Sequence, residues 1–221
     1  MPPNDPSAPD PLETSLDFVN TFGLSGGRQF DDFQTTRQAI DWLHERTDLD
    51  PALIPDSLDS PAVLRRIGRA RSAFRELWDA TVEARPADPG ALREVNRVLR
   101  HRCVLELAPA PAGSGTALRL ENRFTGDEVD CALAGLAEPI VRTVGSIEAE
   151  RARICANDGC RWAFFDDSRT HRRRWCDMSS CGNRAKAARH RARAKAAGPS
   201  TSELAGAPTG QLSDQPVATA P

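Results

Sequence analysis

Four cysteines in the last third of the chain have the spacing of a metal site. Four residues separate Cys155 from Cys160, four separate Cys176 from Cys181, and fifteen lie between the two pairs. A tetrahedral zinc ion takes four thiolates in two such pairs, and each pair closes a turn. The residues inside the pairs, Ala-Asn-Asp-Gly and Asp-Met-Ser-Ser, are turn formers. The spacing therefore predicts one structural Zn²⁺, with no open coordination position for catalysis.

The alternatives to zinc for these four thiols are unrelated burial, two disulfides and an iron–sulfur cluster. The matched spacing argues against unrelated burial, and spacing together with the basic residues that follow favours zinc over a cluster. Disulfides are disfavoured because the N-terminal sequence MPPNDPSAPDP lacks the basic and apolar regions of a signal peptide. We therefore expect a cytoplasmic protein, in which thiols stay reduced. Cys103 and Cys131 stand among apolar residues and are expected to be buried rather than to bind metal.

A strongly basic stretch follows the last cysteine pair. Residues 151–197 contain 13 Lys and Arg against 4 acids, whereas residues 1–150 contain 16 against 25, so the net charge of −2 conceals two opposed halves. Alanines between the cations favour a slim helix, which suits a DNA major groove about 12 Å wide. Cations on such a helix can contact phosphates. The candidate nucleic-acid contacts are Arg172, Arg173, Arg174, Asn183, Arg184, Lys186, Arg189, His190, Arg191 and Arg193.

A basic helix has other uses as well. It can be a solvated helix, or it can dock on the acidic half of the same chain. Its place directly after a metal-bound thiolate favours double-stranded DNA, with RNA binding or protein docking as the second hypothesis. The aromatic residues nearby are expected to be structural. Trp175 should pack over the zinc turns, and a small core should contain Trp162, Phe164 and Phe165.

Upstream, the apolar pattern predicts a mainly helical domain. Apolar residues recur at helical spacing in 31–47, 59–85, 87–102 and 125–152, and a short helix is expected at 16–23, before the break at Ser-Gly-Gly. Two strands around a Pro/Gly/Ser turn predict a hairpin over 103–124. The predicted fold class is α+β. A helical domain with a small β-hairpin spans 12–150, a four-cysteine zinc module ending in the basic helix spans 151–197, and a disordered tail spans 198–221.

Particular residues are expected to shape these helices. Asp31 or Asp32 should cap the helix at 31–47, and Ser60 with Pro61 should begin the next one. Pro139 should kink or split the helix at 125–152. The buried face of the helix at 87–102 is expected to contain Leu92, Val95, Val98 and Leu99.

Membrane and enzyme classes receive no support from the sequence. No apolar run approaches the roughly 18 residues that span a bilayer. The motifs of P-loop, dinucleotide-binding, zinc-protease and serine-hydrolase enzymes are absent. Asp166 and Asp167 adjoin each other, but neighbours on a strand face opposite ways and do not form a catalytic pair. An enzyme with an accessory finger is the least favoured hypothesis, and we expect no catalytic activity.

Two stretches resemble known families. The segment from Cys155 to Lys186 resembles the CGNR zinc finger, whose namesake tetrapeptide stands here as Cys181-Gly182-Asn183-Arg184. The sequence LDFVNT at 16–21 resembles the opening of the ABATE domain, which usually precedes this finger. The resemblance implies Cys155, Cys160, Cys176 and Cys181 as zinc ligands. It also implies DNA binding and a role in stress-induced transcription regulation.

The N-terminal domain is expected to sense a ligand or a partner, or to form a homodimer, because an acidic folded domain precedes a basic module. Polar residues inside an apolar string, and an arginine in the Gly-rich loop, could contact a small-molecule ligand. Equally, the polar residues could satisfy local backbone groups. The candidate ligand contacts are Asp17, Asn20, Thr21 and Arg28.

Overall fold

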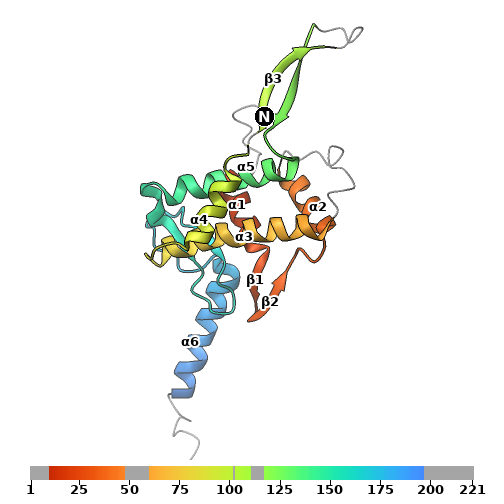
Figure 1. The fold of residues 1–221 in the computed structure, drawn as a ribbon. Coiled ribbons are helices and arrows are strands. Elements are labelled where there is room, and N and C mark those ends of the chain that lie inside the picture. The colour runs from red at the N-terminus through yellow and green to blue at the C-terminus, as the bar shows by residue number, and fades with distance from the viewer. Residues whose placement is uncertain (1–9, 48–59, 102, 111–116, 197–221) are drawn as a thin grey trace, which may run out of the picture. The chain divides into compact units, whose positions relative to one another are not determined.

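The computed structural model describes residues 10–47, 60–101, 103–110 and 117–196, so the expected tail at 198–221 lies outside the described residues. The chain divides into two compact units, Met1–Gly182 and Asn183–Pro221. In chain order the elements are α1 (Pro11–Asn20), β1 (Phe22–Ser25), β2 (Arg28–Asp31), α2 (Thr36–Arg46), α3 (Pro61–Val82), α4 (Pro89–Val98), β3 (Cys103–Pro109), β4 (Leu118–Phe124), α5 (Glu128–Val144), a 3₁₀ helix (Ile147–Arg151), β5 (Ala152–Ile154), β6 (Ala163–Phe165), a π-helical turn (Met178–Gly182) and α6 (Asn183–Ala196) (Figure 1). Helices with small antiparallel hairpins confirm the α+β prediction. Within the described residues, no helix combines the length and apolar composition that crossing a membrane requires.

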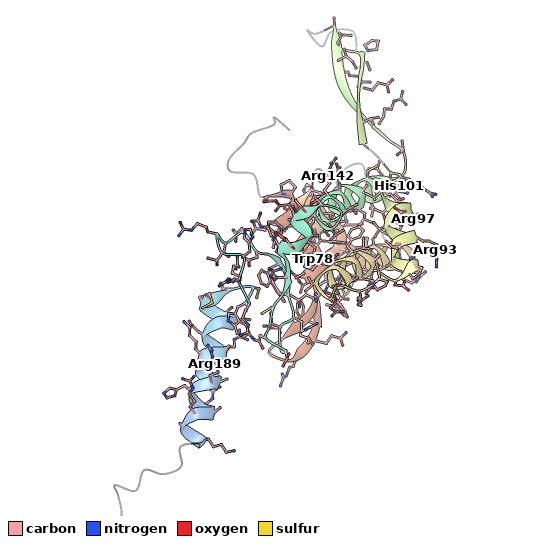
Figure 2. The ribbon with its side chains drawn as sticks, turned by 90° about the vertical axis from the view of Figure 1, so that its left-hand side faces the viewer. Trp78, Arg93, Arg97, His101, Arg142 and Arg189 are labelled. Carbon is pink, nitrogen blue, oxygen red and sulfur yellow. The ribbon has the colours of Figure 1, made fainter. Side chains whose placement is uncertain are left out.

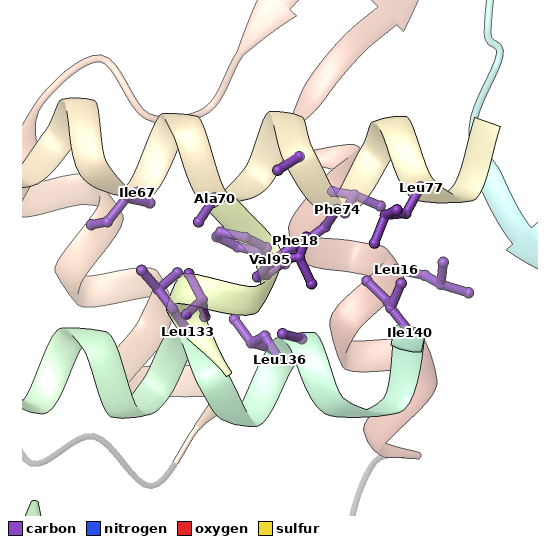
Figure 3. Close-up of a cluster of buried hydrophobic side chains, with 14 of the residues drawn as sticks. Leu16, Phe18, Ile67, Ala70, Phe74, Leu77, Val95, Leu133, Leu136 and Ile140 are labelled. Atoms are coloured by element: carbon purple, nitrogen blue, oxygen red, sulfur yellow. The ribbon is translucent and has the colours of Figure 1, made fainter. Parts of the chain in front are cut away.

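The core of the first unit lies where α1, α3, α4 and α5 meet. Figure 3 shows Phe18, Phe74 and Leu133 directed into the space between these helices. All three side chains are fully buried, and the rings of Phe18 and Phe74 lie 5.9 Å apart in a tilted arrangement. Burial of side chains of this size contributes about 1.5–3 kcal/mol each, so the packing of α1 against α3 and α5 makes a substantial contribution to the stability of the unit.

Several boundaries differ from the predictions because local caps decide them. The first helix begins at Pro11 rather than near residue 16, since the Asp10 carboxylate accepts the Leu12 N–H at 2.7 Å. The second is capped by Thr35, not by Asp31 or Asp32, in a reciprocal capping box with Gln38.

Other predictions about the helices were confirmed only in part. Ser60 and Pro61 do begin α3, although the Ser60 side chain makes no capping hydrogen bond. Pro139 lies inside α5, which continues as one helix. Leu92 is 43% exposed, so its predicted inward position is wrong. The buried stripe of α4 runs through Ala91, Val95 and Val98, one position away from Leu92.

The segment after residue 23, predicted as a break, forms a β-hairpin in addition to the one predicted over 103–124. Strands β1 and β2 pair around Gly26 and Gly27, whose φ angles of +60° and +80° favour glycine. Arg71 of α3 holds this hairpin, because its guanidinium donates to both carboxylate oxygens of Asp31, at 2.8 and 2.9 Å, and to Thr21 Oγ1 at 3.0 Å. Burial raises the Asp31 pKa, but the Arg71 hydrogen bond and charge and the Phe33 amide lower it overall.

The hairpin of β5 and β6 packs against the N-terminal helices. The Asn20 side chain makes two hydrogen bonds to the backbone of Ala163. Its Nδ2 donates to the Ala163 carbonyl and its Oδ1 accepts the Ala163 N–H, each at 2.9 Å. Trp78, a buried residue of α3 (Figure 2), donates from Nε1 to the Arg153 carbonyl at 2.9 Å. Ala152 and Ala163 join the main hydrophobic core. The cysteine-bearing segment is thus continuous with the N-terminal fold up to Gly182.

We predict that Asn20→Ala lowers the free energy of unfolding by about 2–3 kcal/mol, because it leaves the N–H and carbonyl of Ala163 unpaired in a buried site. Urea unfolding followed by far-UV circular dichroism measures the change. Gln29→Ala on β2, where the side chain is exposed, is the control and should shift stability by less than about 0.5 kcal/mol. Equal stability of the Asn20 variant and the wild type would contradict the prediction.

Candidate zinc centre and basic helix

The four cysteine sulfurs predicted as ligands converge at one place. The Sγ atoms of Cys155, Cys160, Cys176 and Cys181 all lie within 4.8 Å of one another. Two of the separations are 3.7 Å, between Cys160 and Cys176, and 3.9 Å, between Cys176 and Cys181. A tetrahedron with Zn–S bonds of about 2.3 Å has edges of about 3.8 Å. The arrangement therefore fits one structural Zn²⁺, as the spacing predicted.

The surroundings of the thiols shift their pKa values in different directions. Burial raises the pKa of the Cys160 thiol to about 11, and burial together with the charges of Cys155 and Cys160 raises that of Cys176. Burial opposes ionisation of Cys181 too, but a hydrogen bond from Asn157, 3.4 Å from its sulfur, and the neighbouring thiols lower its pKa overall. Cys160 and Cys176 carry protons at neutral pH unless a cation replaces them, so metal binding must release protons.

Residues around the sulfurs fix the two turns. The Asn157 carbonyl accepts the N–H groups of Cys160 and Arg161, at 2.8 and 3.0 Å, and its Oδ1 accepts the Gly159 N–H. The Ala156 N–H donates to the Arg174 carbonyl at 2.8 Å, which joins the first turn to the second. Asn157 was not among the predicted site residues. Its place two residues before a glycine in Asn-Asp-Gly is the sequence signal for such a turn.

The first turn is also held from the N-terminal side. The Gly27 N–H donates to the Gly159 carbonyl at 3.0 Å, and a Cβ at Gly159 would lie 3.0 Å from the Gly27 nitrogen. Arg75 of α3 donates to the Arg161 carbonyl at 2.6 Å. Glycine at 159 permits this close approach, because a side chain there would push the backbones of Gly27 and Gly159 apart.

The basic helix α6 carries its charges on two opposite sides. Between Asn183 and Ala196 it has six Lys and Arg residues and no acid. At 100° per residue, Arg184, Arg191 and Lys195 line one side, and Lys186, Arg189 and Arg193 the opposite one. All six Lys and Arg residues of α6 are exposed, and Figure 2 shows the Arg189 side chain projecting from the helix. A helix that is polar all round has no face for packing in a protein core.

Comparison with known families agrees with this geometry. Residues 151–194 match the CGNR zinc finger, and residues 12–146 match ABATE, a family described as "Putative stress-induced transcription regulator". The chain belongs to the ABATE family. The two matches confirm the resemblances seen in LDFVNT and Cys-Gly-Asn-Arg. No curated protein matches the chain.

The aromatic residues of the CGNR finger divide between two environments. Trp175 packs on the sulfur cluster as predicted, together with the buried Phe164. Phe165 packs instead against the main core of the ABATE domain. Trp162 is 37% exposed, so its predicted place in a small core is wrong. Gly182 makes room for this packing, because a Cβ there would lie 2.7 Å from the Met178 sulfur and 3.4 Å from the Trp175 ring.

The three arginines before Cys176 differ in their surroundings. Arg172 is exposed, and the Arg174 guanidinium lies 5.4 Å from the centre of the Trp175 ring. Arg173 is half-buried and donates to Asp167 at 2.8 Å and to the Cys176 carbonyl at 2.6 Å. Arg173 therefore has a structural role in the finger, whereas Arg172 presents its charge to solvent.

Asp166 organises the loop between the two cysteine pairs. Its fully buried carboxylate accepts the Ser168 N–H and hydroxyl, at 3.1 and 2.6 Å, and the Arg173 N–H at 2.8 Å. Burial raises the Asp166 pKa, but the bonds from Ser168 and Arg173 and the charge of Arg153 outweigh burial, so the pKa lies below its ordinary value. The signal that could have revealed this role is the Asp-x-Ser spacing of an Asx turn.

The four predicted ligand contacts of the ABATE domain do not converge. Asn20 is occupied by Ala163, and Thr21 donates to the Phe18 carbonyl and accepts from Arg71. Asp17 is 44% exposed and pairs with Arg46 at 3.2 Å, while Arg28 is exposed on β2. Thr21 thus has the local backbone partner that was the alternative interpretation, whereas Asn20 has a structural partner that is distant in sequence. Cys131 is a buried side chain of α5, as expected.

We predict that Cys155→Ser abolishes stoichiometric zinc binding, because three thiolates hold zinc far more weakly than four. Metal analysis of the purified protein after dialysis should fall from one zinc per chain toward none. Cys131→Ser, a buried cysteine outside the cluster, is the matched control and should retain one zinc. Full zinc content in the Cys155 variant would contradict the assigned ligand set.

We also predict that Asp166→Asn destabilises the protein at neutral pH and has less effect in acid. A carboxylate whose pKa is lowered by folding stabilises the fold above its unfolded pKa of about 4, and this contribution is lost as the pH falls through the folded pKa. Urea midpoints of wild type and variant should therefore converge below about pH 4. A difference that does not change with pH would show that the charge of Asp166 is not involved.

Proposed function

We propose that the protein is a zinc-dependent, DNA-binding transcription regulator in which α6 contacts the DNA backbone. The observation that carries this proposal is the placement of six cations and no acid on a helix that begins two residues after a zinc ligand, Cys181. The metal then fixes the start of a helix that has no apolar face of its own. A regulator of transcription acts on DNA, and the proposal therefore includes a cytoplasmic location.

The charge pattern of α6 suits a polyanion better than solvent. Arg189 and Arg193, and Arg191 and Lys195, stand four residues apart, and like charges at this spacing destabilise a helix by about 0.2–0.5 kcal/mol per pair. Phosphates on the surrounding DNA relieve this repulsion and release counterions. If α6 docked on an acidic protein surface instead, the repulsion would be relieved on only one side of the helix. Charges on both sides of α6 therefore favour a groove, with phosphates on both walls.

We further propose that the ABATE domain receives the signal. A cavity of about 230 Å³ is lined by Val19, Phe22, Arg71, Ser72, Arg75, Glu76 and Asp79. Arg75 both lines this cavity and bonds to the Arg161 carbonyl, next to Cys160. An anionic ligand that attracts Arg75 would disturb the first zinc turn. The proposal assigns no catalytic step to any of these residues.

The test of DNA binding is the double variant Arg189→Gln with Arg193→Gln, because glutamine keeps the helix propensity of arginine. Each lost phosphate contact should weaken binding about tenfold at 0.1 M salt and reduce the slope of log K against log salt by about 0.9. Fluorescence anisotropy with a labelled duplex, at several salt concentrations, measures both quantities.

Arg142→Gln on α5 is the matched control, because the Arg142 side chain is 76% exposed and lies in the ABATE domain. This variant should bind DNA as the wild type does. Unchanged affinity and salt slope in the double variant would refute α6 as the DNA-binding element. Tighter binding to structured RNA than to duplex would favour the alternative function of RNA binding.

A further inference from the structure

A cavity of the ABATE domain, with a volume of about 230 Å³, has both charged and apolar walls. Most of its polar groups share one face of α3, because they stand at helical spacing: Ser72, Arg75, Glu76 and Asp79. Val19 of α1 and Phe22 of β1 add apolar surface. The volume lies below the roughly 300–1,000 Å³ of pockets for drug-sized ligands, so the cavity suits a smaller molecule, of about the size of an amino acid.

The charges of the cavity wall balance. Arg71 and Arg75 are cations, and Glu76 and Asp79 are anions. A ligand whose charge has a single sign meets a repelling group for every attracting one. A ligand with one positive group, one negative group and no net charge matches the wall better, since each of its groups can approach the opposite charge.

The cations of the wall have hydrogen-bond donors to spare. The Arg71 side chain is 9% exposed and its terminal nitrogens hold the β1–β2 hairpin, but its buried Nε has no hydrogen-bond partner in the described part of the chain. Arg75 donates from Nε to Asp79 and from Nη2 to the Arg161 carbonyl, which leaves Nη1 without a bond to any described residue. Guanidinium groups bind carboxylates strongly because both partners are charged. This side of the cavity therefore suits a carboxylate.

Asp79 offers an acceptor for a cation. Its Oδ1 accepts from Arg75 at 2.7 Å, whereas its Oδ2 accepts from no described residue. Burial raises the Asp79 pKa by more than the charge and hydrogen bond of Arg75 lower it, so one arginine does not fully compensate the buried carboxylate. Glu76 is occupied instead, because Arg85 donates to both of its carboxylate oxygens, at 2.5 and 2.8 Å.

We propose that this cavity binds a small apolar α-amino acid. The ligand carboxylate takes the spare arginine donors, its ammonium group donates to Asp79 Oδ2, and its side chain contacts Val19 and Phe22. An α-amino acid carries both charges on one carbon, and Arg75 and Asp79 lie side by side in an ion pair, so one small ligand reaches both. Its carboxylate is the anionic group that attracts Arg75, so the site rests on the proposed role of the ABATE domain as receiver of the signal.

A wider groove gives such a ligand a route to the cavity. The groove has a volume of about 880 Å³ and is lined by residues of α3 and of the beginning of α4. It adjoins the cavity, because the two share four lining residues: Phe22, Arg71, Ser72 and Glu76. Phe22 is 41% exposed, so the apolar wall is within reach of solvent.

The test is isothermal titration calorimetry of the full-length, zinc-loaded protein with single apolar L-amino acids: leucine, isoleucine, valine, methionine and phenylalanine. At least one should bind, with a dissociation constant in the micromolar to millimolar range. The matched carboxylate without the amino group, and the matched amine without the carboxylate, should bind at least about tenfold more weakly, because each lacks one charge-assisted hydrogen bond. For leucine these compounds are isocaproate and isoamylamine.

Asp79→Asn is the variant that tests the ammonium contact, since asparagine keeps the oxygen that accepts from Arg75 and removes the charge. The variant should bind the amino acid about tenfold more weakly and should no longer distinguish it from the matched carboxylate. Asp41→Asn is the matched control, because Asp41 pairs with Arg37 on the exposed surface of α2, and its amino-acid affinity should equal that of the wild type. Far-UV circular dichroism and zinc content verify that both variants are folded.

Failure of all five amino acids to bind would overturn the proposal, as would wild-type affinity in the Asp79 variant. Equal affinity of the wild type for the amino acid and the matched carboxylate would replace the amino-acid site by a simple anion site. DNA affinity, measured with and without saturating amino acid, separates this site from the proposed function. Amino-acid binding without a change in DNA affinity would support the site and contradict the role of the ABATE domain as receiver.

Discussion

Tetrahedral coordination of one metal ion by four cysteine sulfurs is the interaction on which the C-terminal part of the protein depends. The segment from β5 to the π-helical turn buries few large side chains of its own, and its second cluster consists of the cysteines with Phe164 and Trp175. A segment of this length cannot fold on so small a core. The metal joins two turns that are distant in sequence, and the rest of the segment follows from that junction.

The metal does not act alone, because the ABATE domain supplies the other half of the support. Asn20 bonds Ala163, Gly27 bonds Gly159, and Arg75 bonds the Arg161 carbonyl beside a ligand cysteine. We therefore expect zinc binding and folding of the N-terminal helices to be coupled, because loss of either removes contacts from the other. These contacts are the physical basis on which we propose that an event in the ABATE domain affects the zinc ligands.

The sequence predicted what depends on short-range patterns and failed where distant contacts decide. The cysteine spacing identified the ligands, and helical periodicity found α2 to α5, because a turn and a helix are local structures. Asn20 was understood only as a ligand contact or a local cap. Its partner Ala163 lies 143 residues away, and nothing in LDFVNT indicates that distance. Likewise, Leu92 fits a helical stripe by itself, but α3 and α5 determine which stripe of α4 is buried.

The separation of charge along the chain follows from the same architecture. Some acidic residues in the ABATE domain pair with its arginines, as Asp31 does with Arg71 and Glu76 with Arg85, so the charges of these two acids are neutralised within the domain. The cations of α6 have no acid on their own helix to neutralise them. The positive charge of such a helix remains available to attract a partner. The helix also has no apolar stripe that could pack against a hydrophobic core. Charge that would weaken an isolated helix is tolerable here because a metal ion, bound two residues before the helix begins, anchors its first turn in place of a core.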